Sequence, residues 1–220
     1  MRTKFDEQLR QLNIELIRMG SMCEEAISIA AKVLDGDNTV STERVFSLEH
    51  DIDELEHDIE SRCMRMLLQQ QPVAKDLRVI SAALKMISDM ERIGDQAADV
   101  AELTGYVAST VAQGKLHITK MAKAAVMMVT ESIDAFVRAD METAQKVIRD
   151  DDTVDSLFIQ VRKELLASLK EEDDNPEAIL DLLMIAKYFE RIGDHAVNLA
   201  EWVQYSITGV HKSDEHHQDL

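Results

Sequence analysis

Apolar residues recur every three or four positions along most of the chain, and short polar segments separate the apolar runs. Val79, Ala83, Met86, Ile87 and Met90, for example, fall on one side of a helical projection. This period predicts amphipathic α-helices rather than strands, which would alternate every second residue. We expect six helices, near residues 3–34, 42–69, 76–110, 117–139, 142–170 and 177–208.

The chain repeats itself. The segment "MERIGDQAADVAE" begins at Met90, and a near copy, "FERIGDHAVNLAE", begins 99 residues later at Phe189. The helix before each copy also matches, at an offset of 102, when Val45 is aligned with Val147. The only two prolines, Pro72 and Pro176, lie in the loop between these helices in each half. The duplication therefore covers three helices per half.

This organisation predicts an all-α fold made of two tandem three-helix bundles related by internal duplication. Each half can bury its apolar stripes within its own helices, and the two bundles can then pack side by side. The expected boundaries are residues 1–112 for the first bundle, 116–210 for the second, and 211–220 for a polar C-terminal tail. In the second half, Asn175 and Pro176 have the order of an N-cap followed by a first-turn proline.

Composition supports a helical protein and excludes some functions. Seven Gly, two Pro and 4% aromatic residues are few for a sheet protein. The net charge of −18 argues against nucleic-acid binding, which requires a basic surface. Cys23 and Cys63 form no CxxC pair and fall at apolar helical positions, so we expect a reducing, cytoplasmic environment. Because no apolar run approaches the length of a membrane span, we expect membrane contact only through partners.

Acidic residues lie in matching positions beside the apolar face of four helices. Glu91 and Asp95 are four residues apart and therefore share a helix face, as do Glu190 and Asp194 in the second copy. The preceding helices repeat the arrangement with the pairs Glu49 and Asp53, and Asp151 and Asp155. Each bundle thus carries two E/D-x-x-x-D pairs on consecutive helices. If the pairs face each other, four carboxylates converge.

Four close carboxylates repel one another unless they are protonated or neutralised by cations, so a metal site is the sharper hypothesis. Asp99 and its counterpart Asn198 offer further, weaker oxygen ligands. The candidate metal ligands are Glu49, Asp53, Glu91, Asp95, Asp99, Asp151, Asp155, Glu190, Asp194 and Asn198. Oxygen ligands suit magnesium, manganese, calcium or iron, and zinc is kept as a further candidate.

A simpler hypothesis is that the acids lie on a solvated edge in weak ion pairs with arginines such as Arg78, Arg92, Arg162 and Arg191.

His195 replaces Gln96 between the copies, and its helical phase predicts an exposed or interface residue rather than a ligand. Gly94 and Gly193 lie in the apolar arc, where we expect close approach of a neighbouring helix.

Catalysis has little support in the sequence. A di-iron bundle enzyme would need paired Glu-x-x-His ligands, and the chain has no such pair in both halves. We therefore expect a protein that is not an enzyme. A metal-dependent bundle enzyme or metal-storage protein remains the first alternative, and a purely structural helical scaffold the second.

The duplicated ERIGD motif, the segment "QPVAKDLR" from Gln71 to Arg78 and the E/D-x-x-x-D pairs together resemble the PhoU family over essentially the whole chain. The resemblance implies two three-helix bundles, homodimerisation and metal clusters on these acidic motifs. It also implies a cytoplasmic negative regulator of phosphate uptake and of the phosphate-starvation response. Such a regulator is an adaptor between the ATPase of the phosphate ABC transporter and a sensor histidine kinase.

Overall fold

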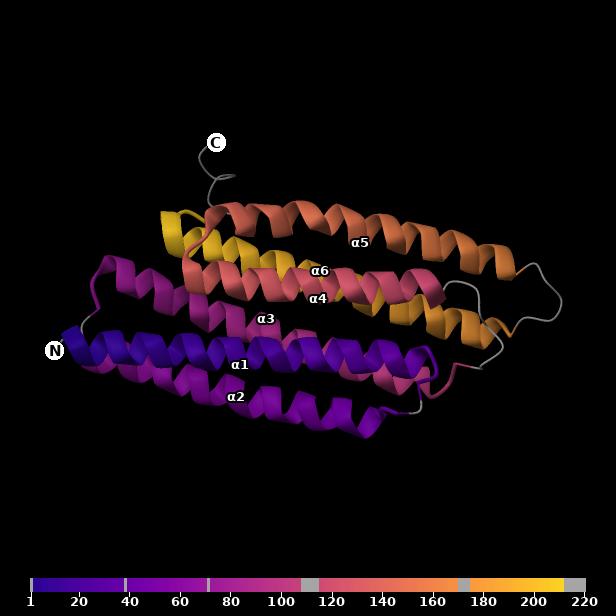
Figure 1. The fold of residues 1–220 in the computed structure, drawn as a ribbon, viewed down its shortest axis with the longest axis horizontal. Coiled ribbons are helices and arrows are strands. Elements are labelled where there is room, and N and C mark those ends of the chain that lie inside the picture. Colours follow the sequence, from indigo (N-terminus) through magenta and orange to yellow (C-terminus); the bar gives the residue numbers. More distant parts are fainter. Residues whose placement is uncertain (1, 38, 71, 108–114, 170–174, 212–220) are drawn as a thin grey trace.

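Six long helices account for nearly all of the chain that the structure describes (Figure 1). The computed structural model describes residues 2–37, 39–70, 72–107, 115–169 and 175–211. The helices are α1 (Arg2–Leu34), α2 (Thr42–Gln70), α3 (Ala74–Thr104), α4 (Lys115–Arg138), α5 (Met141–Ser168) and α6 (Pro176–Thr208). Within these ranges there is no strand, and no helix is long and apolar enough to cross a membrane. The all-α prediction is confirmed.

The helices form two bundles that lie side by side along the long axis of the molecule (Figure 1). In the first bundle α1 packs against α2 and α3, and in the second α4 packs against α5 and α6. In the described part of the chain the bundles meet mainly where α3 packs against α6 and where α1 packs against α4. The buried apolar residues of both halves form one continuous core. Two tandem three-helix bundles are therefore confirmed.

Equivalent ion pairs show that the two halves are built alike. Arg44 of α2 donates to Glu25 of α1 at 2.8 Å, and Lys146 of α5 binds Glu131 of α4 at the matching place in the second half. Both pairs tie the C-terminal part of the first helix of a bundle to the start of its second helix. The duplication thus extends from the sequence motifs to individual side-chain contacts.

Two helix ends test the sequence predictions. The side chain of Asn175 accepts a hydrogen bond from the N–H of Glu177 at 3.1 Å, and Pro176 follows in the first turn, so the predicted cap is confirmed. Helix α3 ends at Thr104, and its predicted extension through the described residues 105–107 is wrong. The N–H groups of Gly105, Tyr106 and Val107 each bond to the carbonyl three residues back, because the chain tightens into turns at a residue that disfavours helix.

The two glycines of the repeated motif lie where helices approach closely. A Cβ atom built on Gly94 would lie 3.1 Å from Ile52 of α2, and one on Gly193 would lie 3.1 Å from the Asp151 Oδ1 atom of α5. Each glycine therefore lets α3 or α6 pack tightly on the preceding helix, as predicted. Cys23 and Cys63 are also fully buried, in agreement with their apolar positions.

His195 occupies an interface rather than an exposed face, so the second of its two predicted positions is confirmed. The residue is only 9% exposed because it lies where α6 packs against α3, and its counterpart Gln96 in α3 is 7% exposed. The Nδ1 atom of His195 lies 2.9 Å from Asp89 Oδ1, and the amide of Asn198 donates to the same oxygen at 3.1 Å. A helical projection shows only the face of α6 that is turned toward the core of its own bundle. The other bundle covers the opposite face of the same helix.

Candidate metal centre

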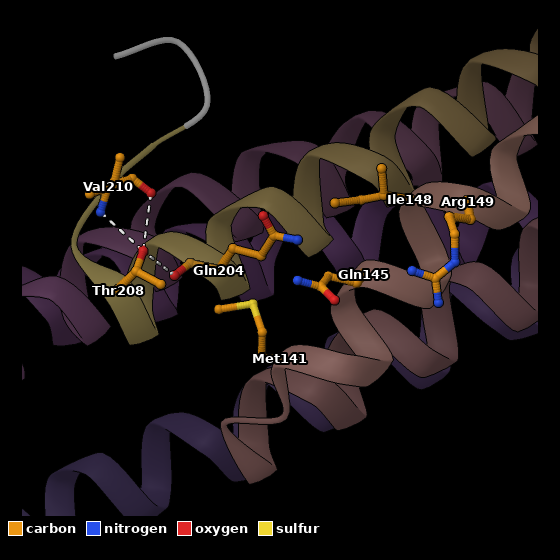
Figure 2. Close-up of a pocket in the computed structure, with 7 residues that line it drawn as sticks. All are labelled: Met141, Gln145, Ile148, Arg149, Gln204, Thr208 and Val210. Carbon is orange, nitrogen blue, oxygen red and sulfur yellow. Dashed lines mark hydrogen bonds between the residues drawn. The ribbon is translucent and has the colours of Figure 1, made fainter. Parts of the chain in front are cut away.

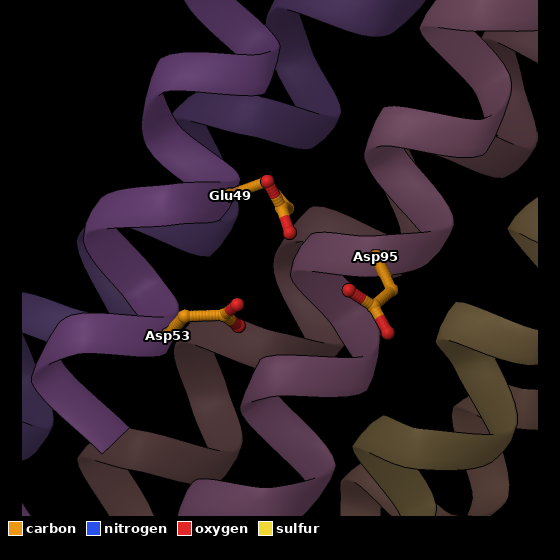
Figure 3. Close-up of side chains that lie close together, drawn as sticks. All are labelled: Glu49, Asp53 and Asp95. Carbon is orange, nitrogen blue, oxygen red and sulfur yellow. The ribbon is translucent and has the colours of Figure 1, made fainter. Parts of the chain in front are cut away.

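Three carboxylates of the first bundle converge between α2 and α3 (Figure 3). Glu49 and Asp53 project from α2, Asp95 projects from α3, and each offers an oxygen atom within 4.8 Å of the other two. The four-residue spacing places Glu49 above Asp53 on one face of α2. Close contact of Ile52 with Gly94 brings α3 near enough for Asp95 to complete the group. All three side chains are partly buried.

The electrostatics of this first carboxylate cluster favour a cation. Burial, followed by repulsion from Asp95, Glu56 and Asp53, raises the pKa of Glu91 to about 7. Burial and neighbouring carboxylates also raise the pKa values of Glu49 and Asp95. Such shifts mean that the charged forms are destabilised where they stand, and a bound cation would relieve that cost.

One oxygen of the cluster lacks a partner. Asp53 Oδ1 is buried and makes no hydrogen bond in the described part of the chain. A buried carboxylate oxygen without a donor is costly, and a metal ion is one of the few groups that could satisfy it. The residues present therefore fit a hard or intermediate cation, since each ligand is a carboxylate oxygen.

The second bundle carries the equivalent acids on α5 and α6, but among the described residues only Glu49, Asp53 and Asp95 bring three carboxylate oxygens within 4.8 Å of one another. Burial, followed by repulsion from Asp155, Asp194 and Glu190, raises the pKa of Asp151 to about 6. Burial and the Glu190 charge likewise raise the pKa of Asp194. Asp151 Oδ1 is buried without a hydrogen bond, as Asp53 Oδ1 is in the first cluster. This second carboxylate cluster is more open, because Asp155 and Asp194 are exposed.

The two clusters differ in their local charge. In the second, the ammonium group of Lys187 binds the Glu190 carboxylate and lies 5.6 Å from the centre of the Phe158 ring. At the equivalent places the first half has Ser88 and Glu56, and the Ser88 hydroxyl donates to Glu56 at 3.0 Å. The first cluster thus has Glu56 where the second has Phe158, and the second has Lys187 where the first has Ser88. Sequence reasoning missed this difference, although aligning the two halves shows both substitutions.

Asp99 and Asn198 lie at the contact between the bundles rather than in the three-carboxylate group. Asn198 donates to Asp89 of α3, and the Tyr188 hydroxyl hydrogen-bonds to Asp99. The two contacts are counterparts, since each joins equivalent positions of α3 and α6 in opposite order. Their role as metal ligands stays a prediction, while their observed contacts hold the bundles together.

The arginine ion pairs of the simpler hypothesis are not formed at these acids. Among the residues that the structure describes, none of the eight acids of the E/D-x-x-x-D pairs has an arginine nitrogen within 4.0 Å. Arg92 lies near enough to offset part of the repulsion at Glu91 and Asp95 without pairing with either. Apart from Glu190, which pairs with Lys187, these acids therefore have no ion pair within the described part of the chain.

A cavity of about 600 Å³ opens between the start of α5 and the end of α6 (Figure 2). Gln145 and Gln204 face each other across it, with Arg149 at one end. The Thr208 hydroxyl is hydrogen-bonded to the backbone of Gln204 and Val210. Among the described residues that line the cavity, Arg149 alone is charged, so they include no acid–base pair. The carboxylate clusters are thus the stronger candidates for function.

Known proteins resemble this chain over nearly its whole length. The PhoU domain family model matches it twice, over residues 16–104 and 118–203. A phosphate-specific transport system accessory protein PhoU homolog from Clostridium acetobutylicum is 34% identical over 212 residues, which cover 93% of this chain and 94% of that protein. A homolog of the same name from Aquifex aeolicus is 36% identical over 189 residues, or 86% of each chain.

The fold agrees with these sequence matches. The crystal structure of PhoU from Pseudomonas aeruginosa superimposes with a TM-score of 0.87 at 31% identity and covers 94% of this chain and 100% of that one. Both copies of the domain, the order of six helices and the duplicated acidic motifs thus lead to one assignment. The chain belongs to the PhoU family.

Proposed function

We propose that this chain is a negative regulator of phosphate uptake and of the phosphate-starvation response. It acts in the cytoplasm, most often as a homodimer, as an adaptor between the ATPase of a phosphate ABC transporter and a sensor histidine kinase. The relatives named as accessory proteins of phosphate-specific transport support the transporter part of this proposal. The kinase, the dimer and the location come from the family resemblance.

The proposal gives the carboxylate clusters a definite role, which is to bind metal ions. Glu49, Asp53, Glu91 and Asp95 would hold ions in the first cluster, and Asp151, Asp155, Glu190 and Asp194 in the second. The observation that supports this most directly is the convergence of Glu49, Asp53 and Asp95 within 4.8 Å, with one buried oxygen unpartnered. A bound cation neutralises the carboxylates and links α2 to α3, or α5 to α6.

The charge difference between the clusters implies unequal affinity. Lys187 already supplies a positive charge beside Glu190, whereas Glu56 adds a negative charge to the first cluster. A cation entering the second cluster must compete with that ammonium group. We therefore expect the first cluster to fill at the lower metal concentration, and magnesium, manganese, iron, calcium or zinc are the ions to compare.

An adaptor of this kind works by differential affinity. A protein that binds one conformation of a transporter more tightly than another reports that conformation to a second partner, by no more than the difference in binding free energy. Metal ions that stiffen the paired helices would preserve the shape that both partners recognise. No chemical step is needed for this function.

The proposal is tested in cells that lack the endogenous gene but retain the transporter. Expression of this chain is expected to restore repression of alkaline phosphatase in high phosphate, and a pull-down from membranes is expected to recover the transporter ATPase. The variant Asp53→Asn, which removes a cluster charge, is compared with Asp51→Asn, which removes an exposed charge from the same helix. The regulator proposal is contradicted if alkaline phosphatase in high phosphate is the same in the deletion strain whether or not this chain is expressed.

A further inference from the structure

A groove of about 550 Å³ lies between the C-terminal part of α1 and the N-terminal half of α4. Ser28 and Ala31 of α1 and Ala122 of α4 line it, and side chains this small leave room between the two helices. Elsewhere the same helices pack tightly, since a Cβ atom on Gly20 would lie 2.9 Å from Ile133. The groove is thus a local opening at the α1–α4 contact between the bundles.

The wall of the groove on α4 is apolar and open. Val126 is half-buried there, and Met127 is 58% exposed although its side chain is large and apolar. An exposed methionine beside a concave apolar surface suits recognition of varied apolar side chains, because its thioether chain adapts its shape. Among the described residues that line this groove, none belongs to the carboxylate clusters; they come from α1, from α4 and from Asp35 just after α1.

The charge around the groove is opposite to that of the protein as a whole. Lys32 and Lys123 line it, and neither lies within 4.0 Å of a carboxylate oxygen among the described residues, although Lys32 is near enough to help lower the pKa of Asp37. Residues 115–130 contain three lysines and no acid, in a chain with 42 acidic residues and a net charge of −18. Asp35, which is the acid among the lining residues that the structure describes, accepts a hydrogen bond from Thr119 at 2.9 Å. An apolar surface with unpaired cations therefore faces solvent.

We propose that this groove binds an amphipathic helix of a partner protein. The apolar side chains of that helix pack on Ala31 and Ala122, and its carboxylates face Lys32 and Lys123. The wall from Ser28 to Asp35, which directly follows the end of α1 at Leu34, is about 10 Å long and matches about two turns of a bound helix. Apolar anchors at positions i, i+4 and i+7 would fit that length. Because the remaining surface repels acidic groups, the two lysines also select where such a helix docks.

The competing occupants fit the groove less well. A second copy of this chain also carries a charge of −18, so a dimer formed through this groove would bring two strongly acidic molecules together at a site with only two lining lysines. An anionic membrane would contact a convex basic face rather than a concave one with apolar walls. The proposal does not depend on metal binding or on the phosphate-regulator assignment, because it uses none of the acidic residues of the clusters.

Two synthetic helical peptides of about 16 residues test the proposal. Both carry leucines at the anchor spacing, one has flanking glutamates, and the other has lysines in their place. Fluorescence anisotropy at physiological salt is expected to show binding of the acidic peptide at least about tenfold tighter than binding of its basic twin. The double variant Lys32→Glu and Lys123→Glu is expected to reverse this preference. Lys120→Glu, an exposed charge change on α4 outside the lining, is expected to leave it unchanged.

A second readout locates the bound peptide. The assigned methyl resonance of Met127 is expected to shift with the acidic peptide and to stay in place with the basic one. Equal binding of both peptides, or binding that survives the double charge reversal, overturns the proposal. Two further results overturn it if the acidic peptide fails to bind. One is binding of the protein to phosphatidylglycerol vesicles that the double variant loses, and the other is concentration-dependent dimerisation that the double variant loses.

Discussion

Without a bound metal ion, the stability of this protein should fall as pH rises, because its clustered carboxylates hold protons more tightly when folded. The pKa of Glu91 rises from 4.5 to about 7 and that of Asp151 from 3.8 to about 6, chiefly through burial. Between the ordinary and the raised pKa the folded state binds more protons than the unfolded state. The free energy of unfolding therefore decreases as pH rises through this range. The loss of stability is complete once the pH exceeds the pKa of the folded state.

The magnitude follows from the two shifts. One pKa unit corresponds to about 1.4 kcal/mol, so each shift at full value would amount to about 3 kcal/mol. Both side chains are partly exposed, and screening by solvent reduces this to about 1 to 1.5 kcal/mol each. We therefore expect chelator-treated protein to lose about 2 to 3 kcal/mol of stability between about pH 4.5 and about pH 7.5.

Urea unfolding at these two pH values, in the presence of chelator, measures the effect. The double variant Glu91→Gln and Asp151→Asn is expected to lose most of the pH dependence and to exceed the original protein in stability at the higher pH. Asp51→Asn, an exposed acid on α2, is the matched control and should keep the original slope. If the double variant keeps the full slope, or if the original protein gains stability with rising pH, the reasoning is refuted.

Three further substitutions test separate parts of the structure. Lys187→Gln removes the cation beside Glu190, so calorimetric titration should show metal affinity at the second cluster rising by about three- to tenfold; unchanged affinity would contradict the charge argument. Gly20→Ala forces a Cβ atom against Ile133, and we expect a loss of about 1 to 3 kcal/mol in urea unfolding, whereas exposed Ser21→Ala should be neutral. Asn175→Ala removes the α6 cap and should cost about 1 kcal/mol by the same measurement, so an unchanged midpoint would argue against the cap.

Much of the fold was predictable because its signals are local and occur twice. The helical period, the cap at Asn175 and the close approach at Gly94 and Gly193 each depend on a few neighbouring residues. The convergence of Asp53 and Asp95 was also predictable, since matched pairs on consecutive helices share one edge of the bundle. A repeated pattern is stronger than a single one, because chance seldom produces the same arrangement in both halves.

The contacts between the bundles were not predictable in the same way. The helical phase of His195 leaves an exposed position and an interface position as alternatives, because a helical projection describes one helix against one core. The burial of His195 against Asp89 depends on which face the second bundle covers, and no local pattern states this. The pairing of Lys187 with Glu190 was within reach, since comparison of Lys187 with Ser88 shows the change of charge.

Titration of chelator-treated protein with Mn²⁺, followed by the electron paramagnetic resonance signal of the free ion, tests the metal-binding role of the clusters most directly. Saturable binding is expected, with Asp53→Asn weakening the tighter class of site by about tenfold or more and Asp155→Asn weakening the other class. Asp51→Asn should bind as the original protein does. Absence of saturable binding, or equal binding by all three variants, would contradict the account.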